Sequence, residues 1–266
     1  MEKYNVKFKK KFGQNFLKDI NIVRRIVDVS GVDDKSLAIE VGPGGAIMTK
    51  ELSYRAKNVL AYEIDTDLMD ELSNKLDGID NVDVLFQDFL NSNLVNDVKN
   101  YDYNDLYFVS NVPYYITTPI ILKLIESRLN FKKIVMMVQK EVGDRFTTKP
   151  GNREYGSITV LLNYYYEIKK EFFVSRKQFV PEPNVDSEVI SFVERKDKLP
   201  LTDFNFFERV LKDSFQFKRK TIRNNLKQYD LKKVEEVLVK YGYDLNVRAE
   251  MLSVEIFVEL ANALVK

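Results

Sequence analysis

The sequence predicts an α/β protein in which a doubly wound domain is followed by a small all-helical domain. Two observations carry this prediction. Between residues 37 and 139, short β-branched apolar runs alternate with stretches of helical periodicity, which is the pattern of a parallel sheet covered by helices on both faces. After residue 193 only amphipathic helical stretches follow, so the second domain is expected to contain helices alone.

Five apolar runs are expected to form the strands of the sheet, because they are short, rich in β-branched residues and nearly continuous. They are residues 37–41, 58–63, 82–86, 105–110 and 133–139. Three stretches between them have helical spacing, at 45–54, 66–76 and 117–129. Ligands of such sheets bind at the carboxyl ends of the strands, so functional residues are expected there.

The boundary between the domains is expected at the charged stretch 194–200, which ends in the helix breaker Pro200. Residues 1–195 are assigned to the first domain and residues 200–266 to the second. Three groups of apolar residues in the second domain each fall on one helical face. They are Phe204, Phe207, Val210, Leu211 and Phe215; Leu231, Val234, Val237, Leu238 and Tyr241; and Ile256, Phe257, Leu260, Ala261 and Leu264.

The composition excludes several kinds of chemistry. The 266 residues include no cysteine and no histidine, which removes thiolate nucleophiles, Ser–His–Asp machinery and nearly all zinc sites, so no metal is predicted. No apolar run approaches the ~18 residues of a membrane span, and the N-terminal sequence lacks the apolar region of a signal peptide. A cytoplasmic protein without a membrane partner is expected.

Positive charge is concentrated at the two ends of the sequence. The net charge is +4 for residues 1–19, −5 for residues 20–199 and +2 for residues 200–266. A polyanion would therefore be bound by the flanks and not by the middle. On composition alone, a simple solvated surface explains these charges equally well.

The first motif, Glu-Val-Gly-Pro-Gly-Gly-Ala at residues 40–46, connects the first predicted strand to a helix. Glycines there let the backbone turn sharply and approach a ligand, which then faces the helix N–H groups. A dinucleotide fingerprint would need glycine at Ile47, and the P-loop ending Gly-Lys-Ser/Thr is absent. NAD and ATP are therefore disfavoured, although the motif alone is also compatible with a plain turn.

Carboxylates follow the next two predicted strands. Glu63 ends the second strand, 21 residues after Gly42, where an acid accepts hydrogen bonds from ribose hydroxyls in nucleotide-binding sheets. Asp88 follows the third strand and can accept a hydrogen bond from an adenine amino group. Each acid alone is compatible with a solvated loop. Together with the glycines they predict an adenosine-containing cofactor without a pyrophosphate, and S-adenosylmethionine fits.

The fourth strand leads into Asn111-Val112-Pro113-Tyr114. An exocyclic amino group is a poor nucleophile because its lone pair is delocalised into the ring. An asparagine oxygen and a backbone carbonyl before or at the proline can hold its two N–H groups and free that lone pair, so no histidine base is needed. The Tyr114 ring would stack on a base turned out of its helix. The alternative is an asparagine-capped turn with packing tyrosines.

These motifs together resemble the bacterial small-subunit (16S) ribosomal RNA adenine N6,N6-dimethyltransferase family over essentially the full length. The matching segments are 12–17, 40–44, 63–65, 88–90, 111–119, 138–142 and 179–187. Two departures are visible. Val112 stands where the family usually has leucine, and Ala46 stands where a third glycine is common.

The resemblance implies a class I, Rossmann-like S-adenosylmethionine methyltransferase. It implies dimethylation of two adjacent adenosines in a hairpin near the 3′ end of 16S rRNA, within an immature small subunit, and a role in small-subunit biogenesis. Residues 1–18 would close over the cofactor. The implied cofactor residues are Asn15, Leu17, Gly42, Glu63, Asp88 and Asn111, and the implied catalytic residues are Asn111, Pro113, Tyr114 and Phe179. Phe179 is expected on a loop stiffened by the prolines that follow it.

The family pattern Phe-x-x-Arg/Lys-Arg/Lys-Lys is present at residues 215–220 and favours RNA binding by the basic ends. The expected RNA-binding residues are Lys9, Lys10, Lys11, Lys218, Arg219, Lys220 and Arg223. Such phosphate contacts supply affinity without reading sequence. The protein is expected to act as a monomer.

Two alternatives remain within this interpretation. One is the related large-subunit (23S) RNA adenine methyltransferase of the antibiotic-resistance type, against which Thr118-Pro119 favours the small-subunit enzyme. The other is a non-catalytic RNA-binding assembly factor on the same fold, against which the intact Glu63, Asp88 and Asn111 argue.

Overall fold

The computed structural model describes residues 16–265 and divides into two compact units. Within those residues the first unit comprises 16–143 and Lys169–Val193, and the second comprises Asp144–Ile168 and 194–265. The predicted division assigned 144–168 to the first domain, whereas their contacts group them with the second. The reason lies in aromatic packing, because Tyr164 and Tyr165 contact Phe207 and Phe204, with ring centroids 5.3 and 5.6 Å apart.

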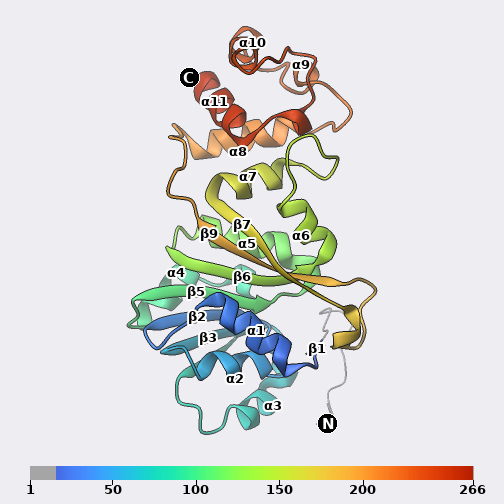
Figure 1. The fold of residues 1–266 in the computed structure, drawn as a ribbon. Coiled ribbons are helices and arrows are strands. Elements are labelled where there is room, and N and C mark those ends of the chain that lie inside the picture. The colour runs from blue at the N-terminus through green and yellow to red at the C-terminus, as the bar shows by residue number, and fades with distance from the viewer. Residues whose placement is uncertain (1–15, 266) are drawn as a thin grey trace. The chain divides into compact units, whose positions relative to one another are not determined.

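The first unit is built on a seven-stranded sheet with the order β4-β3-β2-β5-β6-β9-β7 (Figure 1). Its strands are β2 (Ser36–Val41), β3 (Asn58–Glu63), β4 (Val82–Phe86), β5 (Asp105–Asn111), β6 (Phe131–Gln139), β7 (Tyr166–Val174) and β9 (Ser187–Glu194). Strands β2 to β6 run parallel, and β9 pairs antiparallel with β6. The predicted α/β fold and its five parallel strands are confirmed, while β7 and β9 were not predicted.

The order of the strands determines where a ligand binds. The chain moves outward from β2 through β3 to β4 and then returns to β5 on the other side of β2. The loops that follow β2 and β5 therefore diverge and leave a crevice at the carboxyl ends of these two strands.

The helices of the first unit are α1 (Ile20–Ser30), α2 (Ile47–Ser53), α3 (Met69–Lys75), α4 (Leu94–Asp97) and α5 (Thr117–Glu126), and α6 (Lys140–Phe146) continues into the second unit. Helix α1 was not predicted, although its ends carry clear signals. The Asp19 side chain accepts the Asn21 N–H at 2.9 Å, and Gly31 ends the helix at φ 75°, as expected for an N-cap and a left-handed C-cap.

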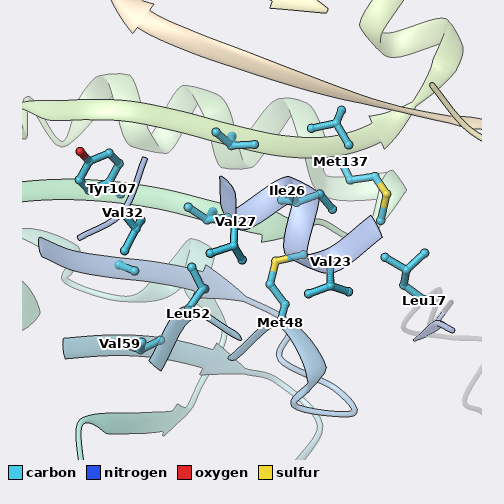
Figure 2. Close-up of a cluster of buried hydrophobic side chains, with 14 of the residues drawn as sticks. Leu17, Val23, Ile26, Val27, Val32, Met48, Leu52, Val59, Tyr107 and Met137 are labelled. Carbon is cyan, nitrogen blue, oxygen red and sulfur yellow. The ribbon is translucent and has the colours of Figure 1, made fainter. Parts of the chain in front are cut away.

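The core of the first unit lies on both faces of its sheet. Figure 2 shows side chains of α1 and α2, such as Val23, Ile26 and Leu52, gathered over Val59 and Tyr107 of the strands. Successive strand residues alternate between faces, so Phe108 points to the opposite side. There it lies 6.0 Å from Phe89, measured between ring centroids. Two covered faces explain why the strands are nearly continuous apolar runs.

Two short strands form a separate sheet beside this core. Strand β1 (Phe16–Leu17) pairs antiparallel with β8 (Phe179–Val180), and Leu17 lies opposite Phe179. Short 3-10 turns complete the unit, at Thr66–Leu68, Phe89–Asn91, Val98–Asn100, Tyr114–Ile116 and Arg176–Gln178.

The second unit is helical. Its helices are α7 (Ser157–Tyr165), α8 (Phe204–Ser214), α9 (Ile222–Asn225), α10 (Leu231–Lys240) and α11 (Val254–Leu264), with a 3-10 turn at Ala249–Met251. The three helices predicted from apolar periodicity correspond to α8, α10 and α11. Across residues 16–265, the structure contains no helix with the length and apolar character of a membrane span.

Candidate functional site

A cavity of about 240 Å³ lies at the carboxyl ends of the central strands of the first unit. It is lined by residues that follow β2, β3, β4 and β5, at the crevice that the strand order creates. Several predicted site residues contribute to its wall: Leu17, Gly42, Glu63, Asp88, Asn111, Pro113 and Tyr114. Asn15, Lys9, Lys10 and Lys11 lie outside the described residues.

The glycine-rich turn that follows β2 forms part of the cavity wall. Gly42 and Gly44 have φ angles of 75° and 50°, a region that favours glycine. The need is greatest at Gly44, where a Cβ atom would lie 2.6 Å from Cε1 of Phe16. Ala46 also has a positive φ, 59°, and is fully buried. Ala46 therefore adopts a backbone conformation that a glycine would take with less strain.

Glu63 ends β3 with only 4% of its surface exposed. Its Oε2 accepts the Gly44 N–H at 3.2 Å and its Oε1 accepts the Asp65 N–H at 2.9 Å. Burial raises the pKa of Glu63, and these two backbone hydrogen bonds oppose that rise. Because each carboxylate oxygen has two lone pairs, the Glu63 carboxylate retains acceptor capacity for ligand hydroxyls beyond its backbone hydrogen bonds.

Glu40 is a second buried acid on the cavity wall, and the sequence analysis did not single it out. It lies on β2, is 2% exposed, and its Oε2 has no hydrogen-bond partner among the described residues. Burial, together with the nearby Glu63, raises the pKa of Glu40 to about 8. A cationic ligand group beside Glu40 would favour the ionised form of this carboxyl and donate a hydrogen bond to its Oε2. Glu40 could have been identified from the sequence, because it stands two residues before Gly42 at the end of a predicted strand.

Asp88 follows β4 and has a structural task of its own. Its Oδ1 accepts the Leu90 N–H at 2.9 Å, and its Oδ2 accepts Asn91 Nδ2 at 2.7 Å. The side chain thereby caps the turn after β4 and holds its carboxylate at the cavity wall. One lone pair of each oxygen stays available to a ligand.

The end of β5 contributes Asn111, Pro113 and Tyr114 to the cavity. The Tyr114 hydroxyl forms a 2.5 Å hydrogen bond with Oγ of Ser187, which is fully buried at the start of β9. Burial raises the pKa of Tyr114, so its hydroxyl stays protonated at neutral pH. Ser187 therefore fixes the outer end of the ring, a role that the sequence analysis missed because β9 was not predicted.

Phe179 lies in a different environment from the one expected. It is 1% exposed, belongs to strand β8 and packs in the core cluster with Leu17 and Val23, and it is absent from the cavity wall. Its predicted contact with the target base remains a prediction, which requires the side chain to become uncovered.

The predicted RNA-binding side chains of the second unit are Lys218, Arg219, Lys220 and Arg223, and all four are exposed. The described part of the chain places no cluster of three acidic side chains in an arrangement suited to a metal ion.

The cavity fits S-adenosylmethionine by its donor and acceptor set. Glu63 offers its remaining acceptor capacity for a ribose diol, and Glu40 offers a buried acceptor without a partner for an ammonium group. The backbone at Gly42 and Gly44 approaches without side chains. No position in this set requires a metal or a phosphate.

Comparison with known proteins agrees with the site. A family model described as "Ribosomal RNA adenine dimethylase" matches residues 5–266. The chain is 44% identical to "Ribosomal RNA small subunit methyltransferase A" of Bacillus cereus (strain B4264), covering 100% of this chain and 94% of the relative. The protein of the same name from Bacillus cytotoxicus is 43% identical with the same coverage.

Two solved structures share the fold. The dimethyladenosine transferase from Plasmodium falciparum aligns with a TM-score of 0.78 and 25% identity, over 92% of this chain and 95% of that one. The 23S rRNA methyltransferase ErmE aligns with a TM-score of 0.72 and 26% identity, over 94% of this chain and 99% of that one. The resemblance inferred from the sequence motifs is confirmed, and the chain belongs to the ribosomal RNA adenine dimethylase family.

Proposed function

We propose that this protein transfers methyl groups from S-adenosylmethionine to the N6 amino groups of two adjacent adenosines near the 3′ end of small-subunit ribosomal RNA. The observation that carries the proposal is that one cavity joins the acids at the ends of β2 and β3 to Asn111, Pro113 and Tyr114 at the end of β5. The small-subunit substrate is supported by relatives at 43–44% identity that carry that name. The 23S enzyme ErmE is less similar, at 26%.

The bound cofactor supplies an electrophilic methyl group on a sulfonium centre. In the proposal, Glu63 binds the ribose hydroxyls with its remaining acceptor capacity, and Glu40 accepts from the ammonium group of the methionine end. The positive φ angles at Gly42 and Gly44 bring backbone close to the ligand without a side chain between them.

The residues after β5 act on the adenine amino group. Asn111 accepts one of its N–H bonds through the side-chain oxygen. The Pro113 carbonyl accepts the Ile116 N–H at 3.1 Å and would have to take a second hydrogen bond, so we assign the second acceptor to the carbonyl of Val112 and keep Pro113 as the residue that fixes the turn. Holding both N–H groups favours a pyramidal nitrogen whose lone pair points toward the methyl group. The product is cationic and loses its proton readily, so the reaction needs no histidine.

Tyr114 supplies the stacking face for a base that has left its helix. Since its hydroxyl is bonded to Ser187, the ring is held before the substrate arrives. Tyr115 is exposed and also lines the cavity, so it provides a second aromatic surface next to Tyr114. We further propose that the substrate is the immature small subunit in the cytoplasm and that the protein acts as a monomer.

One experiment tests this function. The protein is incubated with labelled S-adenosylmethionine and small-subunit particles that lack the modification, in parallel with large-subunit RNA, and the methylated bases are mapped. Dimethylation of two adjacent adenosines near the 3′ end of the small-subunit RNA is expected, with Asn111→Ala as the inactive control. Labelling of the large-subunit RNA instead, or of neither RNA, would contradict the proposal.

A further inference from the structure

The loop that follows α8 exposes an aromatic side chain directly beside three cations. Phe217 is 56% exposed and precedes Lys218, Arg219 and Lys220. In the family pattern Phe-x-x-Arg/Lys-Arg/Lys-Lys, position 217 is one of the two unspecified positions. A single exposed aromatic residue needs no explanation by itself, so its surroundings decide what it does.

The backbone beneath Phe217 is held in place by a buried side chain. Asn225 is 3% exposed, and its Nδ2 donates to the carbonyls of Ser214 and Phe217, at 2.7 and 3.3 Å. The Phe217 carbonyl also accepts the Lys220 N–H at 2.8 Å. The backbone of the loop is therefore fixed at the position from which the Phe217 side chain projects into water. Little backbone freedom is lost when a partner binds there.

The cations around Phe217 are not neutralised by ion pairs. Lys218, Arg219, Lys220, Arg223 and Lys227 form no ion pair with any residue in the range 16–265. The nearest preceding acid in the chain, Asp213, accepts hydrogen bonds from Tyr229 and Gln228, at 2.6 and 3.1 Å. The loop thus combines an exposed aromatic side chain on a fixed backbone with positive charge that is available to a polyanion.

Phe173 on β7 provides an internal comparison, because it is almost equally exposed, at 54%. The cations that precede it are paired, since Lys169 contacts Glu171 at 3.0 Å and Lys170 contacts Glu188 at 3.2 Å. Exposure alone is therefore shared by both phenylalanines. Of these two described phenylalanines, only Phe217 is followed directly in the sequence by cations without an ion pair.

We propose that residues 215–221 form a stacking platform for an unpaired RNA base, with Phe217 against the base and Lys218, Arg219, Lys220 and Arg223 on the flanking phosphates. Aromatic faces stack on any base that has no pairing or stacking neighbour, and cations beside them bind the backbone. The inference rests on the proposed function in that the substrate is RNA. It adds a preference of the second unit for unpaired nucleotides.

The test uses the fluorescence of a single introduced tryptophan. The chain contains no tryptophan, so Phe217→Trp introduces a single indole at the platform, and Phe173→Trp introduces a matched one elsewhere. A short unpaired RNA oligonucleotide is expected to quench the Phe217→Trp emission at saturation, because a base stacks on the indole. The Phe173→Trp emission should stay unchanged, and an RNA duplex of equal length should quench neither.

Affinity measurements separate stacking from charge. Phe217→Ala is expected to weaken binding of the unpaired oligonucleotide about 5- to 100-fold without changing its salt dependence. Phe217→Tyr should retain the affinity, and Phe217→Leu, which is apolar but not aromatic, should not. The triple substitution Lys218→Ala, Arg219→Ala and Lys220→Ala should instead lower the salt slope by about two to three.

The outcomes distinguish this inference from the proposed function. The platform would be overturned if Phe217→Ala bound the unpaired oligonucleotide as tightly as the unsubstituted protein, or if the oligonucleotide quenched both tryptophans equally. Neither result would contradict the proposed methylation of small-subunit RNA. Failure of the unsubstituted protein to methylate small-subunit RNA would overturn the proposed function, whatever the fluorescence reports.

Discussion

The two ends of the cavity are built in different ways. At the cofactor end, Gly44 and Glu63 are joined by a hydrogen bond across 19 residues of sequence, between segments that follow the adjacent parallel strands β2 and β3. At the base end, Tyr114 is joined to Ser187 across 73 residues, and Ser187 belongs to the antiparallel strand β9. The cofactor end is therefore encoded by local motifs and parallel register, whereas the base end depends on a distant strand.

This difference separates the expected effects of substitution. Buried carboxylates and a tight backbone turn fix the cofactor end, so changes there should alter cofactor affinity and stability. In the proposed function the residues at the base end act on the amino group during transfer, so changes there should alter the rate. Each prediction below tests whether the two ends respond separately.

The largest effect is expected at the base end. Asn111→Ala removes an acceptor that polarises the amino group mainly in the transition state, so methyl transfer should fall at least ~100-fold. Binding of RNA should persist through the cations of the second unit. Single-turnover rates and RNA affinity measured on the same preparation check this. A rate within about tenfold of the unsubstituted protein would remove Asn111 from the chemistry.

Gly44→Ala should produce the largest effect at the cofactor end. The new side chain meets a positive φ of 50° and lies 2.6 Å from the Phe16 ring. Backbone strain of about 1–2 kcal/mol and overpacking of about 1–3 kcal/mol should both lower the free energy of unfolding. Gly31→Ala is the matched control, since φ is 75° but nothing lies within 4 Å. Equal losses at both positions would mean that the clash with Phe16 is absent.

Glu63→Ala should weaken S-adenosylmethionine binding by about 1–3 kcal/mol, the range for hydrogen bonds to a charged group. Calorimetry of the folded variant measures this, and the RNA affinity should not change. Glu63→Gln keeps the size of the side chain and one oxygen acceptor, so its loss should be smaller. Unchanged cofactor affinity in the alanine variant would place the ribose elsewhere.

Glu40 predicts a pH dependence of stability at the cofactor end. Its pKa is about 8 in the folded protein against an ordinary value of 4.5, so between these values the folded state binds more protons than the unfolded state. The contribution to stability is fully present below pH 4.5 and is lost as the pH rises toward 8. Glu40→Gln should therefore gain stability relative to the unsubstituted protein by up to ~1.4 kcal/mol per pH unit across this window. Unfolding curves of both proteins at pH 5 and pH 7.5 measure this difference. The same difference in the free energy of unfolding at both pH values would contradict the raised pKa of Glu40.

The parts of the protein that the sequence predicted share one property. Strands β3 and β4 begin and end where the apolar runs predicted them, at Asn58–Glu63 and Val82–Phe86, although β4 lies at the edge of the sheet and is only partly buried. Gly42 and Glu63 lie on the cavity wall at the ends of predicted strands. Their roles depend on strand ends, and the carboxyl ends of adjacent parallel strands meet at one edge.

The parts that were missed depend on contacts that local pattern does not encode. The segment 144–168 was placed in the first domain because no charged linker precedes it, although Tyr164 and Tyr165 pack on α8. Phe179 was expected on a loop near the base, yet pairing of β8 with β1 buries it. Ser187 ends the matching segment 179–187, but its contact with the Tyr114 hydroxyl depends on the pairing of β9 with β6 and could not be predicted from that segment.

That contact yields the smallest and most discriminating prediction. If the Tyr114 ring stacks on the target base, Tyr114→Ala should lose most activity, while Tyr114→Phe keeps the ring and loses only the hydrogen bond to Ser187. A hydrogen bond between neutral groups contributes about 0.5–1.5 kcal/mol, so the rate should fall no more than about tenfold. Ser187→Ala should produce a loss of similar size, because it frees the same ring.

The double variant decides whether Ser187 acts through Tyr114. When Tyr114→Phe and Ser187→Ala are combined, the loss should not exceed that of either single change, since both remove one interaction. Additive losses would mean that Ser187 supports β9 independently of the ring. A Tyr114→Phe variant that binds RNA and cofactor normally yet is as inactive as Tyr114→Ala would overturn the stacking role. It would assign the hydroxyl a direct part in proton transfer, which amino-group methylation with Asn111 as acceptor does not require.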